Sequence, residues 1–243
     1  MDSVLVGSTL SALATGVGAI PVLLFQQVTH RWRDILLAFT AGIMMAASAF
    51  SLIPEALDSS NFWVLAVGLL FGAVTLTVLE LYIPHIDLGH ERRKIPFDRK
   101  ALLIISAITL HNLPEGLSVG VSYASEDEGL GGLIAFAIGL QNAPEGFLVA
   151  LFLVQQRVNK FKAFLIATMT GAVEIITSLI GYSLTSIFGD LVPYGLSFAA
   201  GAMLFIIYKE LIPESHGDGH ARGATFAFII GLLVMIYLIR WSG

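Results

Sequence analysis

The chain is 243 residues long, 56% hydrophobic and only 13% charged, with a mean hydropathy of +0.83. The charged share is about half of that in ordinary soluble domains, which excludes a soluble globular protein. The formal net charge of −5 gives no indication of a nucleic-acid partner, and the lack of cysteine excludes disulfides and thiolate metal sites.

Eight apolar stretches follow one another along the chain, each close to the length of about 20 residues that spans a bilayer. They leave no room for a separate soluble domain. We therefore predict an all-α integral membrane protein with eight transmembrane helices in a single domain, residues 1–243. The stretches cover residues 4–28, 35–57, 62–83, 101–123, 130–154, 163–188, 191–211 and 222–241.

Lys and Arg are concentrated in alternate connections between these stretches, whereas the other connections carry Asp58, Asp190 and the acidic run 126–128. Twelve of the 13 basic residues fall on the first side, and only Arg240 falls on the second. Basic connections of membrane proteins usually face the cytoplasm. The pattern predicts a multi-pass protein of the plasma (inner) membrane with both termini outside.

Two related hexads introduce polar residues into the fourth and fifth stretches. His111-Asn-Leu-Pro-Glu-Gly116 and Gln141-Asn-Ala-Pro-Glu-Gly146 share Asn, Pro, Glu and Gly at the same positions. Their midpoint lies near residue 128, so each hexad is equally far along one arm of an antiparallel hairpin. With a rise of about 1.5 Å per residue, both hexads are expected near the middle of the bilayer, facing each other.

Within each hexad, the first, second and fifth residues are three or four positions apart and share one helical face. These residues are His111, Asn112, Glu115, Gln141, Asn142 and Glu145. The prolines between them, Pro114 and Pro144, cannot donate to the preceding turn, so each helix is expected to kink beside its polar residues.

Two further residues lie at a similar depth, Glu174 in the sixth stretch and Met44 in the second. A carboxylate at the centre of a bilayer costs roughly 2.5–3.5 kcal/mol on insertion scales. Three of them, Glu115, Glu145 and Glu174, are expected to cluster, and no Lys or Arg within the spans is expected to neutralise them. Bound cations or protons must therefore balance the charge.

Imidazole combined with carboxylates and amides favours divalent first-row transition metals over Ca²⁺ and Mg²⁺. An intramembrane metalloprotease would carry HExxH, which the chain lacks, so no enzyme activity is expected. A proton-coupled carrier of another small cationic solute is the alternative function, because buried Glu and His also form proton relays. No resident cofactor is expected, since the metal would be the transported substrate.

The paired hexads, Glu174 in GAVEIITSLIG and the segment AGIMMAASAFSLIPEALD resemble the ZIP (Zrt/Irt-like) divalent metal transporters, in particular their prokaryotic GufA-like branch. The resemblance covers essentially the whole chain. It implies a 3+2+3 arrangement, in which the first and last three helices are inverted repeats around helices four and five. It also implies uptake of zinc into the cytoplasm, with cadmium, iron, manganese or cobalt as other substrates, and it is compatible with a homodimer.

The resemblance further implies a binuclear metal site in which Glu115 and Glu145 bridge two ions. Asp58 matches an entrance residue, and Lys209 stands where His is common on the release path, which would remove one ligand there. The first ion would bind Met44, His111, Glu115, Gln141 and Glu145, and the second Asn112, Glu115, Asn142, Glu145 and Glu174. The residues that match the release path are Glu80, His85 and Glu210.

Overall fold

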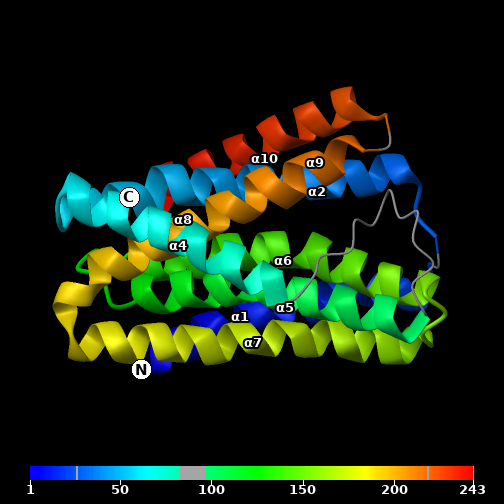
Figure 1. Ribbon diagram of the computed structural model, residues 1–243, viewed down its shortest axis with the longest axis horizontal. Helices are drawn as coiled ribbons and strands as arrows, with labels where there is room; N and C mark the ends of the chain where they lie inside the picture. Colours follow the sequence, from blue (N-terminus) through cyan, green and yellow to red (C-terminus); the bar gives the residue numbers. More distant parts are fainter. Residues whose placement is uncertain (26, 83–96, 218, 243) are drawn as a thin grey trace.

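A computed structural model of the chain describes residues 1–25, 27–82, 97–217 and 219–242 (Figure 1). Eight helical segments in this part of the chain are long and apolar enough to cross a membrane, which confirms the predicted all-α fold and the number of spans. These segments are Asp2–Leu23, His30–Asp58, Phe62–Leu81, Ala101–Ser122, Leu130–Gln155, Lys160–Ile187, Gly189–His216 and Ala221–Trp241.

Six of these eight spans are built mainly from one α-helix. α5 and α6 continue through Pro114 and Pro144, each of which leaves only one carbonyl of its helix without the usual donor. The six helices are α1 (Asp2–Ala19, prolonged by the 3₁₀ turn Ile20–Leu23), α4 (Phe62–Tyr82), α5 (Phe97–Ser122), α6 (Leu130–Gln155), α7 (Lys160–Ile187) and α10 (Ala221–Ser242).

The second and seventh spans each contain a π-helical turn, which the sequence analysis did not predict. Each π turn lies directly before an Ile-Pro pair, with Pro54 or Pro213 in the first turn of the next α segment. Because proline cannot donate to the preceding turn, a wider turn before it accommodates the unpaired carbonyl. The segments are α2 (His30–Ala47), the π turn Ser48–Leu52 and α3 (Ile53–Asp58), and then the 3₁₀ turn Gly189–Leu191, α8 (Val192–Ile206), the π turn Ile207–Leu211 and α9 (Ile212–His216).

The seventh span is longer than predicted. The predicted stretch ended at residue 211, but the chain stays helical through the π turn and α9 to His216. Pro213 does not end the helix, because proline fits the first turn of a new α segment. At the same end of the bundle, α5 already begins at Phe97, before the predicted stretch 101–123.

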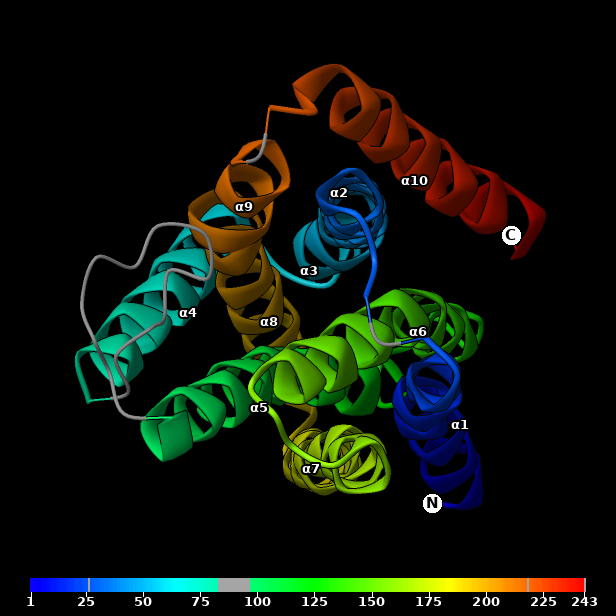
Figure 2. The ribbon, with the colours of Figure 1, turned by 90° about the vertical axis from the view of Figure 1, so that its right-hand side faces the viewer.

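The helices form two groups when the molecule is viewed along the bundle (Figure 2). In the first group, α2 packs against α10 and α4 packs against α8, with α3 and α9 alongside. In the second group, α1, α6 and α7 contact one another and α5 packs along α7. The two groups meet mainly where α2 contacts α6 and where α5 contacts α8.

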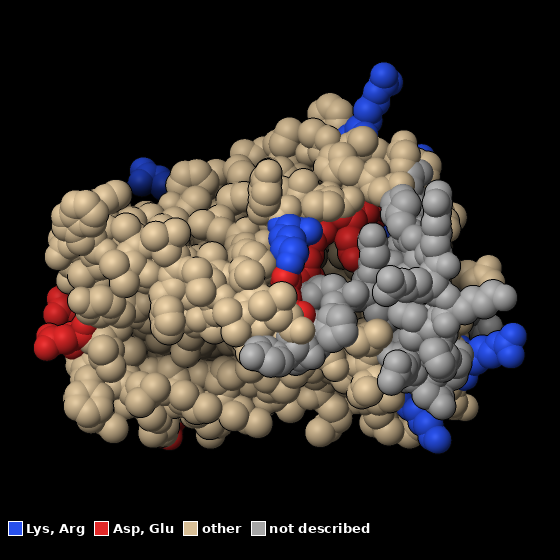
Figure 3. Space-filling model, viewed as in Figure 1, with Lys and Arg blue, Asp and Glu red and all other residues tan. Residues whose placement is uncertain are grey.

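The two ends of the bundle differ in charge. Both chain termini lie at one end (Figure 1), as an even number of spans requires. In the space-filling view, one group of acidic side chains lies at that end and another lies beside a basic side chain toward the other end, near which most Lys and Arg project (Figure 3). We call the end with Asp58, Asp127 and Asp190 the acidic end, and the end with Arg157 and Lys162 the basic end.

Candidate metal site

The two hexads contact each other in the interior of the bundle. Gln141 Nε2 on α6 donates a hydrogen bond of 2.6 Å to Glu115 Oε1 on α5, and both side chains are completely buried. A direct contact between these residues requires that the hexads lie at the same depth on neighbouring helices. The predicted geometry of the hairpin is therefore confirmed.

The second hexad also contacts α7, the helix that carries Glu174. Asn142 Nδ2 lies 2.9 Å and 2.8 Å from the two carboxylate oxygens of Glu174, and both residues are buried. Glu174 therefore joins the polar cluster at the depth that the sequence predicted. Its carboxylate accepts from a neutral amide there, not from a basic side chain.

α1 adds a residue that the sequence analysis missed. Ser11 Oγ donates to Glu174 Oε2 at 3.0 Å, and Asn142 Nδ2 lies 3.1 Å from Ser11 O and 3.3 Å from Ser11 Oγ. Ser11 shares a buried helical face with Ser8 and Thr15. Such a face of small residues usually serves helix packing, so the sequence alone gave no reason to assign Ser11 to the site.

The other polar residues of the first hexad turn toward different helices. His111 Nε2 and Glu210 Oε2, in the π turn after α8, are hydrogen bonded at 2.6 Å. Asn112 Nδ2 donates to the main-chain oxygen of Thr170 on α7 at 2.8 Å. The three polar residues of this hexad therefore contact the seventh span, α7 and α6 respectively, and His111 is already linked to a residue of the expected release path.

A narrow cavity of about 80 Å³ leads from this cluster toward the basic end. His111, Glu145, Glu210 and Glu214 supply its polar lining, and the other lining side chains are apolar. Glu145 is buried and faces this cavity. Met44 is fully buried on α2, the helix of the first group that contacts α6.

The remaining residues of the expected path lie nearer the ends of the bundle. Lys209 forms an ion pair with Glu80, and its ammonium lies 5.1 Å from the centre of the Phe205 ring. The expectation that no basic residue lies within a span was wrong for Lys209, although its charge is matched by Glu80. Asp58 is exposed at the end of α3, and His85 lies outside the described residues.

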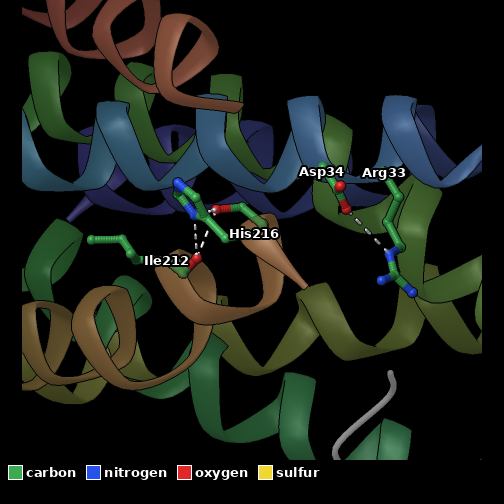
Figure 4. Close-up of polar contacts among 5 residues, drawn as sticks. Arg33, Asp34, Ile212 and His216 are labelled. Carbon is green, nitrogen blue, oxygen red and sulfur yellow. Dashed lines mark hydrogen bonds and ion pairs between the residues drawn. The ribbon is translucent and has the colours of Figure 1, made fainter. Parts of the chain in front are cut away.

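The rim of the bundle at the basic end contains a further buried carboxylate. Asp34, near the start of α2, is completely buried, and its Oδ1 lies 3.9 Å from Arg33 Nε (Figure 4). Nearby, His216 Nδ1 lies 2.9 Å from the main-chain oxygen of Ile212, which holds the end of α9 (Figure 4). Asp34 lies just before the second predicted stretch, 35–57, and the sequence analysis assigned it no role.

Two buried oxygen atoms of the cluster could coordinate a cation. Glu115 Oε2 and Gln141 Oε1 are buried without a hydrogen-bond partner among the described residues. Buried acceptors that lack a donor are rare, and a cation would satisfy them. In the described part of the chain, however, no three His, Asp or Glu side chains are already arranged to hold one metal ion. Two of the carboxylates, Glu115 and Glu174, are hydrogen bonded to amide side chains instead.

Comparison with known proteins identifies similar transporters. The sequence profile of the ZIP zinc transporter family matches residues 88–239. The chain is 37% identical to the zinc transporter GufA of Myxococcus xanthus, over 98% of each protein. It is 35% identical to the zinc transporter ZIPB of Bordetella bronchiseptica, over 96% of this chain and 79% of the relative. Identity to the zinc transporter ZupT of Streptococcus mutans is 28%, over 94% of this chain and 93% of the relative.

Proposed function

The chain belongs to the ZIP zinc transporter family, and on this basis we propose that it carries zinc ions across a membrane through the cluster formed by the two hexads and Glu174. The resemblance inferred from the sequence is thereby confirmed, as is the conclusion that the chain is not an enzyme. The observation that carries the proposal is the direct contact between Gln141 and Glu115 at the centre of the bundle.

The proposed site holds two ions that share Glu115 and Glu145. Three carboxylates would face two divalent cations, a better balance of charge than one cation would give. Neutral imidazole and amide oxygens complete each coordination shell, which suits zinc and its first-row neighbours. The proposed ligands are Met44, His111, Glu115, Gln141 and Glu145 for the first ion, and Asn112, Glu115, Asn142, Glu145 and Glu174 for the second.

The amide side chains can serve both as partners of the carboxylates and as metal ligands. Gln141 and Asn142 present N–H groups to Glu115 and Glu174. A metal ion needs the opposite end of the amide, because only the oxygen is an acceptor. A half-turn of each amide would exchange nitrogen for oxygen as the ion takes the place of the N–H donor. The two amides can thus change from hydrogen-bond donors to metal ligands without movement of the helix backbones.

Release toward the basic end is proposed to follow the narrow cavity. His111 belongs to the first ion's ligands and also contacts Glu210, so one side chain links the site to the exit. Glu214 lies farther along the same cavity. Lys209 compensates Glu80 beside this path and thereby reduces the negative charge that would retain an ion near the exit.

The inverted repeats implied by the family resemblance are supported by a pair of related segments. Residues 41–55 and 200–214, offset by 159 positions, are identical at seven of 15 positions. Both contain a π turn at the same place, Ser48–Leu52 in one and Ile207–Leu211 in the other. Because the second span runs toward the acidic end and the seventh toward the basic end, the two segments have opposite orientations. Such repeats favour alternating access by movement of one helix group against the other.

The proposed transport direction follows from the charge of the two ends. Basic connections face the cytoplasm, so the ion would enter at the acidic end, near Asp58, and leave at the basic end. We propose accordingly that the protein lies in the plasma (inner) membrane with both termini outside. A homodimer stays a prediction.

Uptake of isotopic zinc into proteoliposomes tests the proposal. The wild-type chain should accumulate zinc, and Glu145→Gln, which keeps the shape but removes the bridging charge, should reduce uptake to about the level of empty vesicles. Glu128→Gln, an exposed acidic residue outside the site, is the matched control and should transport normally. Asn112→Ala removes one neutral ligand and should lower uptake less than Glu145→Gln.

Two results would contradict this proposal. Normal zinc flux through Glu145→Gln would show that the carboxylate does not bind the transported ion. Proton flux driven by another cationic solute, without zinc uptake by the wild-type chain, would favour the proton-coupled carrier. Competition by cadmium, iron, manganese or cobalt in the same assay would rank the other proposed substrates.

A further inference from the structure

A second cavity lies at the acidic end of the bundle, apart from the candidate metal site. Its volume is about 250 Å³, and it lies between the second span and the turn that joins α5 to α6. Three carboxylates line it, those of Glu55, Asp58 and Asp127, and no Lys or Arg is among its described lining residues. Glu126 lies close enough to Glu55 to add to the negative field.

A buried hydroxyl without a partner points to a ligand in this cavity. Ser51 is only 6% exposed and lines the cavity, one helical turn deeper than Glu55. Its Oγ has no hydrogen-bond partner among the described residues. A buried polar atom of this kind is usually satisfied by a ligand, an ion or water.

The carboxylates are held near Ser51 by local structure. The main chain of Asp127 lies within hydrogen-bonding reach of the Glu55 carboxylate, which ties the turn between α5 and α6 to α3. Asp127 Oδ1 also accepts a hydrogen bond of 2.8 Å from the N–H of Gly129, which fixes the side chain at the start of α6. Two like charges are therefore fixed close to each other, and a cation between them would remove their repulsion.

We propose that Ser51, Glu55 and Asp127 form a binding site for a hard divalent cation of the Ca²⁺ type. All the polar lining groups are oxygen donors, and His and Met are absent from the described lining residues. Carboxylate, hydroxyl and water oxygens suit Ca²⁺, whereas a site for the transported transition metal would gain from imidazole or thioether ligands. The cation binds at this site and is not transported.

The internal repeat gives an independent reason to expect a functional site here. With the offset of 159 positions, Ser51 and Glu55 correspond to Glu210 and Glu214, which line the cavity toward the basic end. Both ends of the bundle thus have a cavity lined by equivalent positions of the two π-containing spans. Glu210 has His111 as its partner, whereas Ser51 faces an all-oxygen cavity.

The cation would join the two helix groups at the acidic end. Ser51 and Glu55 belong to the second span, in the first group, whereas Asp127 precedes α6, in the second group. A cation coordinated from both sides opposes their separation. It therefore slows entry of the transported ion from that end.

Ca²⁺ binding to the purified full-length chain tests the site directly. Calorimetry and thermal melting with CaCl₂ should detect one site whose occupation raises the melting temperature, because a ligand of the native state stabilises it. Asp127→Asn and Ser51→Ala should each weaken Ca²⁺ binding at least about tenfold. Glu128→Gln in the same turn, which does not line the cavity, should bind Ca²⁺ as the wild type does.

The proposal is independent of the transport site, and the assay separates the two. Glu115→Gln should abolish zinc uptake but leave Ca²⁺ binding unchanged. In proteoliposomes, Ca²⁺ on the acidic side should slow zinc uptake by the wild type and leave Asp127→Asn unaffected. Equal Ca²⁺ binding by Asp127→Asn and wild type would overturn the proposal. Displacement of Ca²⁺ from the Glu115→Gln protein by an equal concentration of Zn²⁺ would also overturn it.

Discussion

Among single residues, the buried carboxylates of Glu115 and Glu174 receive their hydrogen bonds from neutral groups. Gln141 donates to Glu115, and Asn142 and Ser11 donate to Glu174. A hydrogen bond to a charged group contributes about 1.5–3 kcal/mol, so these donors orient the carboxylates without cancelling their charge. The negative charge remains available to a cation, which a lysine in the same place would repel.

Ser11 provides the sharpest test of this arrangement, because it positions Glu174 and is not itself a proposed ligand. Ser11→Ala removes the 3.0 Å hydrogen bond to Glu174 Oε2. We expect the KM for zinc uptake to rise about tenfold, as is common when a partner of a metal ligand is lost, with little change in the maximal rate. Ser11→Thr, which keeps the hydroxyl, should restore most of the affinity.

Ser8→Ala is the matched control for this experiment. Ser8 lies on the same buried face of α1, but its hydroxyl donates to the main-chain oxygen of Val4, within the helix. Its loss should leave the KM unchanged. Equal effects of Ser8→Ala and Ser11→Ala would mean that Ser11 contributes only to helix packing.

At the scale of helices, the part of the site that lies on the hairpin of the fourth and fifth spans could be predicted from the sequence. The two hexads are symmetric about the turn near residue 128, so their shared depth followed from counting residues, and Gln141 does contact Glu115. The partner of His111 could not be predicted in this way. Glu210 is 99 positions away, on a span whose last turns were taken for a connection.

The contribution of α1 was missed for a similar reason. The periodicity of a helix indicates which face is buried, but not which neighbour covers that face. Likewise, the π turns have no signature in a single sequence beyond the Ile-Pro pairs that follow them. Their positions became interpretable only when both spans could be compared in the structure.

The glycine that ends each hexad brings the helices close enough for these contacts. A Cβ added at Gly146 would overlap the main-chain oxygen of Thr15 on α1. Gly146→Ala should therefore push α1 away from α6, at a cost of about 1–3 kcal/mol for overpacking, and reduce zinc uptake because Glu145 is the adjacent residue. Thermal melting and zinc uptake of the purified variant would measure both effects.

Gly132→Ala supplies the comparison on the same helix. A Cβ at Gly132 would meet no atom within 4 Å, and alanine favours the helix by roughly 0.5–1 kcal/mol. This variant should melt at the same temperature as the wild type or higher, with unchanged uptake. If Gly146→Ala behaved like Gly132→Ala, close contact between α1 and α6 would not be required.

At the scale of the whole molecule, the proposed site lies where the two helix groups meet. Met44 comes from the first group, and the two hexads and Glu174 come from the second. Relative movement of the groups would change access to the ions while most ligands move together. The cavity toward the basic end reaches His111 and Glu145. Residues of both helix groups border the cavity at the acidic end. Closure of the proposed site toward the acidic end would have to occur there.

The orientation of the molecule in the membrane can be tested with cysteine substitutions, because the chain has no native cysteine. Asp190 and Lys162 are both exposed, at the acidic and the basic end respectively. In intact cells, a membrane-impermeant thiol reagent should label Asp190→Cys at once and Lys162→Cys only after permeabilisation, since the basic connections face the cytoplasm. Zinc uptake by each variant verifies that the protein remains folded. The reverse labelling pattern would place the open cavity on the outside, and the proposed direction of transport would then be wrong.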